Sequence, residues 1–387
     1  MPEHNLNRES TAALYIHIPF CLSKCDYCGF NSYPLNRYDP AAYMETLNRQ
    51  IQLLAGHPLI QGMLFDTVYI GGGTPTCIET DLLLRLLSFL KKNFRLEAET
   101  EFTIEANPGS LNLEGLVRLA SAGINRISLG VQSFSNRLLA DIGRNHSEED
   151  IYQGVEKIRK AGLTNLSLDL IFGLPGQSVR DFRSSLERAL SLDPKHISLY
   201  ELMVEEGTPL ADKLAEGRLT LPDEDLVAEM AETARTVCRA KGFRQYEIAN
   251  FARKNWHCRH NLHYWHNHNY LGLGAGAVSG LQGMRITSEA DPEPFSARLK
   301  EGQLPVIAME GLCRQASFRE TVIMGLRMVR GVSLGELKRR FQISALNYYG
   351  GELAELMDKD LIETREGRLR LTERGLPVAN QVLSRLV

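Results

Sequence analysis

The chain has 387 residues, of which 43% are hydrophobic, so it is long enough for one large α/β domain and a smaller one. Its 44 Lys and Arg residues nearly balance 47 Asp and Glu residues, and the formal net charge of −3 argues against binding nucleic acid or anionic lipid through overall charge. Seven cysteines, three of them within residues 21–28, are a poor disulfide framework and favour a metal or cluster site.

The first ten residues, MPEHNLNRES, are polar and lack the charged-then-apolar order of a signal peptide. The sequence also contains no run of about 18 apolar residues that would span a membrane as a helix. We therefore expect a cytoplasmic protein, including the inner face of the membrane as a peripheral location. The sequence leaves a homodimer open.

Short β-branched runs alternate with helical patterns from residue 14 to about residue 250. The predicted strands are Leu14–Ile18, Thr67–Ile70, Glu101–Glu105, Arg126–Leu129, Asn165–Ile171 and His196–Tyr200. The predicted helices are Pro40–Leu54, Glu79–Asn93, Leu113–Ala122, Ser147–Ala161, Val179–Leu192 and Asp223–Lys241. This alternation indicates an α/β fold with a parallel sheet, either an open, partial barrel or a doubly wound sheet, because six units are too few for a closed eight-stranded barrel. Edge strands are expected near Gln245–Asn250 and Val278–Gly280.

The pattern changes after residue 290. Helices are predicted near Ala316–Met328, Leu334–Phe341 and Ala345–Asp360, followed by a hairpin of Leu361–Thr364 and Arg368–Leu371. Three helices and a hairpin are typical of a small winged-helix-like domain, which we assign to residues 291–387, with the first domain covering 1–290. No strongly basic recognition helix is evident, so we expect a packing role and no nucleic acid partner.

The strongest chemical signal is the spacing of Cys21, Cys25 and Cys28 in a loop that follows the first predicted strand. Three thiolates can hold three irons of a cubane cluster and leave the fourth iron free to bind a cofactor. A zinc site with His17 as fourth ligand is the alternative. The features downstream favour the cluster.

Polar residues follow the other predicted strands at their carboxyl ends. Gly71-Gly72-Gly73-Thr74-Pro75 follows the second strand, and its glycines allow a ligand to approach the backbone closely. The later strands are followed by Glu105, Asn107, Gln132, Arg144, Asp169, Tyr200 and Glu201. Because ligands bind at this edge of parallel α/β sheets, we expect one pocket that includes the cysteine loop.

Half of the ten histidines lie between residues 257 and 268, within NWHCRHNLHYWHNHNYLGLGAGA. Imidazole and thiolate are heme-iron ligands, and nearby aromatic rings can pack on a porphyrin. A polar surface loop is the alternative for any one of these histidines. His260 is the first candidate ligand and Cys258 the second.

The motifs C-x3-C-x2-C and GGGTP resemble those of radical S-adenosylmethionine (radical SAM) proteins. More narrowly, LYIHIPFC, GGGTPT, IEANP, ISLGVQSF, SLDLIFGLPGQ and YEIANF resemble the oxygen-independent coproporphyrinogen III oxidase family. This resemblance implies a partial open (β/α)6 barrel with a 4Fe-4S cluster on Cys21, Cys25 and Cys28. It implies S-adenosylmethionine as a cofactor, contacted by Tyr15, Tyr27, Gly72, Gly73, Thr74, Glu105, Gln132, Arg144 and Asp169. An external donor would supply the electron that cleaves the cofactor into a radical.

Two features distinguish the chain from the true oxidases. Phe30 occupies the position of a further cysteine in the oxidase pattern, and only thirteen residues precede Leu14. The chain instead resembles the sister family of heme chaperones, whose His-Asn-x-x-Tyr-Trp motif matches His260, Asn261, Tyr264 and Trp265. The resemblance implies that these residues bind heme, which is then delivered to respiratory-chain proteins. The alternative is coproporphyrinogen III decarboxylation or another radical reaction on a tetrapyrrole.

Overall fold

The computed structural model describes residues 11–387, so the polar start from which we inferred the absence of an export signal lies outside the described residues. A single twelve-stranded sheet organises the larger part of the chain, in the order β14-β13-β12-β11-β1-β4-β5-β6-β7-β8-β10-β9. Its centre consists of six neighbouring parallel strands: β1 (Thr11–Ile18), β4 (Leu64–Gly72), β5 (Arg95–Ala106), β6 (Arg126–Gln132), β7 (Asn165–Phe172) and β8 (His196–Glu201). These are the six predicted strands, and their parallel pairing confirms the partial α/β barrel.

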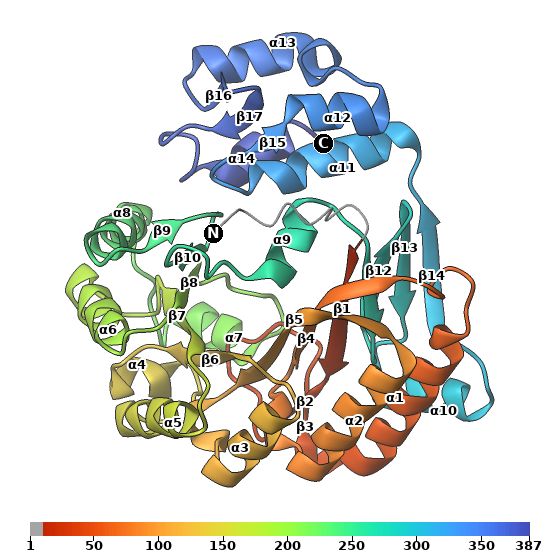
Figure 1. The fold of residues 1–387 in the computed structure, drawn as a ribbon. Helices are drawn as coiled ribbons and strands as arrows, with labels where there is room; N and C mark the ends of the chain where they lie inside the picture. The colour runs from red at the N-terminus through yellow and green to blue at the C-terminus, as the bar shows by residue number, and fades with distance from the viewer. Residues whose placement is uncertain (1–10) are drawn as a thin grey trace.

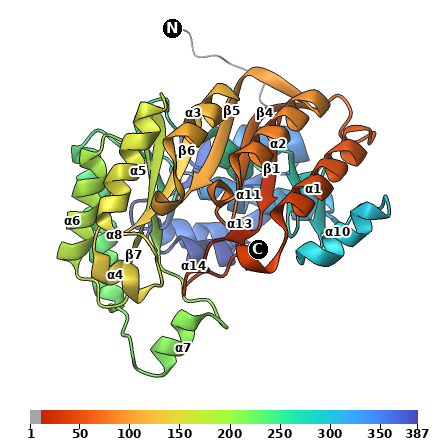
Figure 2. The same ribbon diagram turned by 90° about the horizontal axis from the view of Figure 1, so that it is seen from below.

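Helices cover the outer face of the curved sheet (Figures 1 and 2). They are α1 (Pro40–Ala55), α2 (Thr80–Asn93), α3 (Leu113–Ser121), α4 (Asn136–Asp141), α5 (Glu148–Lys160), α6 (Val179–Ser191) and α8 (Glu224–Ala240). The short α7 (Pro209–Ala215) projects away from this layer in Figure 2. Each crossover helix buries an apolar stripe against the sheet, as Leu83, Leu86 and Leu90 of α2 do, so burial of these stripes holds the two layers together.

The edges of the sheet are broader than the sequence indicates. Beside β1 lies the parallel strand β11 (Tyr270–Leu273), followed by antiparallel β12 (Val278–Leu281), β13 (Met284–Ser288) and β14 (Val306–Gly311). At the other edge, the predicted strand Gln245–Asn250 is two shorter strands, β9 (Arg244–Gln245) and β10 (Asn250–Ala252). They are separated because Glu247 pairs with Met328 of the C-terminal part instead of with the sheet.

The C-terminal unit has a hydrophobic core of its own, which includes Phe318, Val322 and Leu353. It contains α11 (Arg314–Leu326), β15 (Val332–Ser333), α12 (Leu334–Phe341), α13 (Ala345–Asp358), β16 (Ile362–Arg365), β17 (Arg368–Leu371) and α14 (Ala379–Ser384). Helix α10 (Pro292–Lys300) packs on α1, and β14 pairs in the large sheet. We therefore propose that the two units divide near residue 312 and not after residue 290.

The C-terminal unit lies over the end of the sheet at which the parallel strands begin, with the short helix α9 (Arg259–Trp265) between them (Figure 1). Several hydrogen bonds connect it to the residues after α9. Among them, Arg340 donates to the Asn267 carbonyl at 3.1 Å, and the Asn267 amide donates to Glu320 at 2.9 Å. Within residues 11–387, no helix has the length and apolar character needed to cross a membrane.

Candidate cluster and cofactor site

The three clustered cysteines lie on the loop that leaves the carboxyl end of β1. Each is only partly buried, and each sulfur has a polar neighbour. Cys21 Sγ lies 3.5 Å from Thr74 Oγ1, and the Arg144 guanidinium donates to Cys25 Sγ at 3.4 Å. Burial raises the pKa of the Cys21 thiol, although its hydrogen bond with Thr74 opposes the effect.

A cavity of about 470 Å³ opens beside this loop, within the size range of small-molecule and cofactor sites. It brings together the strand-end residues that the sequence predicts for one pocket. The predicted residues that line it are Cys21, Cys25, Tyr27, Cys28, Gly72, Gly73, Thr74, Glu105, Asn107, Gln132, Arg144, Asp169, Tyr200 and Glu201. The structure therefore brings these residues together in one cavity at the carboxyl edge of the sheet, as expected.

Two carboxyl groups lie in the floor of this cavity. Glu105 accepts hydrogen bonds from the Tyr69 hydroxyl at 2.8 Å and from the Gly72 N–H at 3.1 Å, and burial raises its pKa to about 7. Asp169 accepts from the Ser128 hydroxyl at 2.8 Å, and burial raises its pKa as well. Hydrogen-bonded carboxyl groups in a partly dry cavity are suited to binding the hydroxyl and amino groups of a polar ligand.

A second network joins the cavity wall to the cysteine loop. The Arg144 guanidinium donates to Asn107 Oδ1 at 2.8 Å and to the Gly130 carbonyl at 2.6 Å. The Asn107 amide in turn donates to Thr74 Oγ1 at 2.9 Å. These contacts fix the position of Arg144 between the end of β6 and Cys25. The guanidinium is therefore held where it can neutralise negative charge on the cysteine thiolates.

The glycine-rich turn after β4 lets the chain pass close to the cysteine loop. A Cβ atom on Gly73 would lie 2.4 Å from the Phe20 carbonyl oxygen, which is too close for any side chain. Gly72 has a φ of +111°, and a Cβ atom there would lie 2.5 Å from the His17 ring. Both positions require glycine, and the turn therefore forms a smooth backbone wall for a ligand.

The donor set fits a 4Fe-4S cluster better than zinc. The zinc alternative needs His17, but His17 Nε2 bonds the Asn31 carbonyl at 2.8 Å and Nδ1 bonds the Tyr15 hydroxyl at 2.9 Å. Among residues 11–387, no three His, Cys, Asp or Glu side chains are arranged to hold one metal ion. Three thiols without a fourth protein donor instead match a cluster that leaves one iron for a cofactor.

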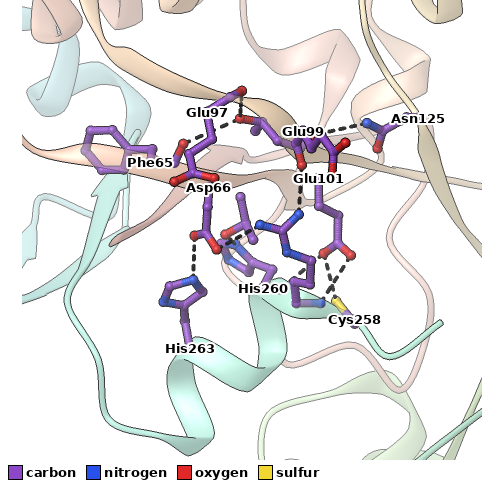
Figure 3. A network of polar contacts seen from close by, with 12 residues as sticks. Phe65, Asp66, Glu97, Glu99, Glu101, Asn125, Cys258, His260 and His263 are labelled. Carbon is purple, nitrogen blue, oxygen red and sulfur yellow. Dashed lines mark hydrogen bonds and ion pairs between the residues drawn. The ribbon is translucent and has the colours of Figure 1, made fainter. Parts of the chain in front are cut away.

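The histidine-rich segment lies at the opposite end of the barrel (Figure 1), and Figure 3 shows the polar contacts around its helix α9. Two buried carboxylates, Asp66 near the start of β4 and Glu101 in the middle of β5, hold this helix. Glu101 accepts from the backbone N–H groups of Arg259 and His260, both at 3.1 Å, and from Cys258 Sγ at 3.6 Å. Asp66 contacts the Arg259 guanidinium at 2.9 Å and His263 Nε2 at 2.6 Å. The helix is therefore a plug fixed by charge-assisted hydrogen bonds.

The proposed heme ligand His260 is buried within this plug, with 1% of its surface exposed. Its Nδ1 lies 3.0 Å from Thr67 Oγ1, its Nε2 lies 3.1 Å from the Tyr264 hydroxyl, and its ring packs on Tyr69. Because both ring nitrogens have partners, His260 offers none to iron in this conformation. Cys258 is fully buried and is equally unsuited.

The other predicted heme residues have structural surroundings of the same kind. Tyr264 packs edge-on against Tyr270, and the Arg327 guanidinium lies 4.8 Å from the centre of the Trp265 ring, in the contact with the C-terminal unit. Asn261 is half-buried in α9. Tyr15 also differs from expectation, since it does not line the cavity and instead bonds His17 behind Tyr69.

Sequence analysis missed the residues that hold α9. Asp66 and Glu101 are charged, yet they are only 2% and 7% exposed. The available signal was a charged residue at or beside the start of an otherwise apolar predicted strand. Such a residue needs a buried partner of opposite charge or a backbone donor, and here α9 supplies the N–H groups and a guanidinium.

Comparison with known proteins places this geometry in a family. The Radical SAM superfamily model matches residues 15–189, and the HemN C-terminal domain model matches residues 314–378. The heme chaperone HemW of Lactococcus lactis subsp. lactis is 35% identical over 379 residues, which cover 96% of each chain. The heme chaperone HemW of Bacillus subtilis is 36% identical, covering 95% of this chain and 97% of its own.

This chain belongs to the HemW family. Its fold also matches the solved structure of the coproporphyrinogen III oxidase HemN from Escherichia coli, with a TM-score of 0.85 and 23% identity, over 98% of this chain and 90% of that one. HemW-family membership and the radical SAM match give this chain a 4Fe-4S cluster and S-adenosylmethionine as cofactors. The fold likeness extends through the C-terminal unit, in agreement with the predicted two-part architecture.

Proposed function

We propose that this protein is a heme chaperone that binds heme and passes it to an acceptor protein. The observation that carries the proposal is the match to curated heme chaperones over nearly the whole of both chains, including the C-terminal unit. The proposal includes delivery of heme to respiratory-chain proteins and an external electron donor. It also includes a peripheral location at the inner face of the membrane and a homodimer.

The cavity supports definite roles for the residues around it. Cys21, Cys25 and Cys28 would hold the cluster, and the Gly72–Thr74 backbone, Glu105 and Asp169 would bind the polar groups of S-adenosylmethionine. Tyr27, Gln132 and Arg144 would complete the wall. When bound, the cluster supplies an electron that can cleave the cofactor's sulfonium bond. The residues of the chain bind and orient the cofactor, and Arg144 balances the charge of the thiolates.

The alternative function is oxidative decarboxylation of coproporphyrinogen III, which the HemN fold supports. Phe30 argues against it. The side chain is 72% exposed and lines the cavity where the oxidase pattern has a further cysteine. An exposed phenyl ring can neither bind iron nor move a proton, so this position serves a purpose other than the oxidase chemistry.

The deciding experiment uses the full chain with its cluster reconstituted anaerobically. Hemin is titrated into one sample, and coproporphyrinogen III with S-adenosylmethionine and reductant is added to another. We expect stoichiometric hemin binding and no protoporphyrinogen. Transfer is then measured by mixing the hemin-loaded protein with a heme-free cytochrome. Absence of hemin binding contradicts the chaperone proposal, and formation of protoporphyrinogen supports the oxidase.

A further inference from the structure

Large apolar side chains are exposed around the opening of the cofactor cavity. Phe30 is 72% exposed and Met203 is 68% exposed, and both line the cavity. On the same cysteine loop as Phe30, Leu22 is 65% exposed, and Val204, next to Met203, is 38% exposed. A single exposed apolar residue is ordinary, but a group around one opening indicates a surface that a ligand covers.

The two loops that carry these side chains are held against each other. Gly29 lies so close to Glu205 that a Cβ atom on it would be 2.8 Å from the Glu205 Cγ atom. Tyr27 and Leu202 pack against the same small hydrophobic cluster. Phe30 and Met203 therefore flank a fixed contact, and their apolar surfaces face water for a reason other than loop mobility.

We propose that Phe30 and Met203 form a rim on which the apolar macrocycle of heme packs, over the mouth of the cofactor cavity. This inference rests on the proposed chaperone function and gives it a binding site. An aromatic ring and a flexible thioether suit a flat porphyrin face. Lys24 adds charge complementarity, because its exposed ammonium lies 3.2 Å from the Phe30 carbonyl, where it can reach a heme propionate.

The size of the cavity supports a site over the mouth and not inside it. A volume of about 470 Å³ suits a single cofactor-sized ligand. With S-adenosylmethionine inside, the macrocycle must lie on the rim. A porphyrin in that position closes the cavity, so bound hemin slows the release of S-adenosylmethionine.

The test compares two double variants in the reconstituted protein. Phe30→Ala with Met203→Ala removes the rim, whereas Ile307→Ala with Met309→Ala removes an apolar pair on β14 that is 51% and 63% exposed. Hemin and metal-free protoporphyrin IX are titrated into each. Because burial of each apolar side chain under the macrocycle adds to affinity, we expect affinity for both porphyrins to fall about tenfold or more in the rim variant alone. In that variant, bound hemin should also no longer slow the release of S-adenosylmethionine.

The outcomes separate this inference from the chaperone proposal. If the unaltered protein binds no hemin, the chaperone proposal and the rim fail together. If the unaltered protein binds hemin, and the rim variant binds hemin and protoporphyrin IX as tightly as the unaltered protein does, the rim is wrong and the chaperone proposal stands. A loss of hemin affinity without any loss for protoporphyrin IX also contradicts the rim, because packing on the macrocycle does not need iron. Iron and sulfide content verifies that each variant is folded with its cluster.

Discussion

The two ends of the barrel hold similar kinds of side chain in opposite situations. At the carboxyl end, Cys25 and Cys28 are only partly buried beside an open cavity. At the other end, His260 and Cys258 are buried and hydrogen-bonded to strand residues and α9. The cysteine loop and the histidine-rich segment are both rich in residues that can bind a metal. Of the four residues compared, however, only Cys25 and Cys28 face a space that a ligand can enter.

The partners of a side chain decide whether it can bind a ligand. A buried imidazole with both nitrogens bonded contributes to the fold, because breaking those bonds would leave buried polar groups unpaired. A partly exposed thiol beside a fixed guanidinium has no such penalty when it binds iron. Four substitutions test this contrast.

The largest effect is expected at the cysteine loop. Cys25→Ala removes one of three thiolates, so we expect the protein to lose its cluster and the broad visible absorbance that accompanies it. Iron and sulfide analysis of anaerobically reconstituted protein measures the loss. The matched control is Cys313→Ala, since Cys313 is exposed and lies in the C-terminal unit. Full iron content in the Cys25→Ala variant would contradict the assignment of the cluster to this loop.

The next effect is expected at the anchor of α9. Asp66→Asn removes a 2% exposed charge that Arg259 and His263 face, and we expect the free energy of unfolding to fall by about 2–3 kcal/mol. Urea unfolding measures the change. The control Glu45→Gln, in the exposed pair with Arg49, should change it by less than about 0.5 kcal/mol.

The Asp66 contribution also has a defined pH dependence. Burial acts to raise its pKa, but hydrogen bonds and charge from His263 and Arg259 outweigh burial and lower the pKa from 3.8 to about 2. Because the folded pKa lies below the unfolded one, the stabilisation is present above about pH 4 and is lost as the pH falls through about 2. The difference between the original protein and Asp66→Asn should therefore shrink in acid. A constant difference would contradict the ionised pair.

Local pattern was sufficient to predict the six central strands, their crossover helices and the pocket edge. The six parallel strands and the C-terminal hairpin follow from apolar runs and turn residues. In the structure, Glu366 and Gly367 between the two hairpin strands have positive φ, as a tight turn requires. The location of α9 depends on Asp66 and Glu101. Asp66 lies 193 residues from Arg259 in the sequence, and Glu101 lies 159 residues from His260. Such long-range pairing leaves no local pattern, so the sequence predicts His260 as a heme ligand without showing that both of its ring nitrogens have partners.

A smaller effect is expected at the glycine-rich turn. Gly73→Ala forces a Cβ atom against the Phe20 carbonyl, so the turn must shift, at a cost of about 1–3 kcal/mol. We expect weaker binding of S-adenosylmethionine, measured by calorimetry on protein with its cluster intact. Gly311→Ala is the matched control, because a Cβ atom there meets no atom within 4 Å. Equal affinities for the two variants would show that the turn does not line the cofactor.

The smallest effect on ligand binding is expected at His260. His260→Ala removes hydrogen bonds to Thr67 and Tyr264, so it should lower stability by about 1–3 kcal/mol. Because the ring offers iron no free nitrogen, the dissociation constant for hemin should stay unchanged in the folded fraction, and iron–sulfur content should too. His260→Gln keeps hydrogen-bonding capacity if the alanine variant does not fold. A marked loss of hemin affinity in both variants would mean that α9 opens to bind heme, and would return the heme site to this end of the barrel.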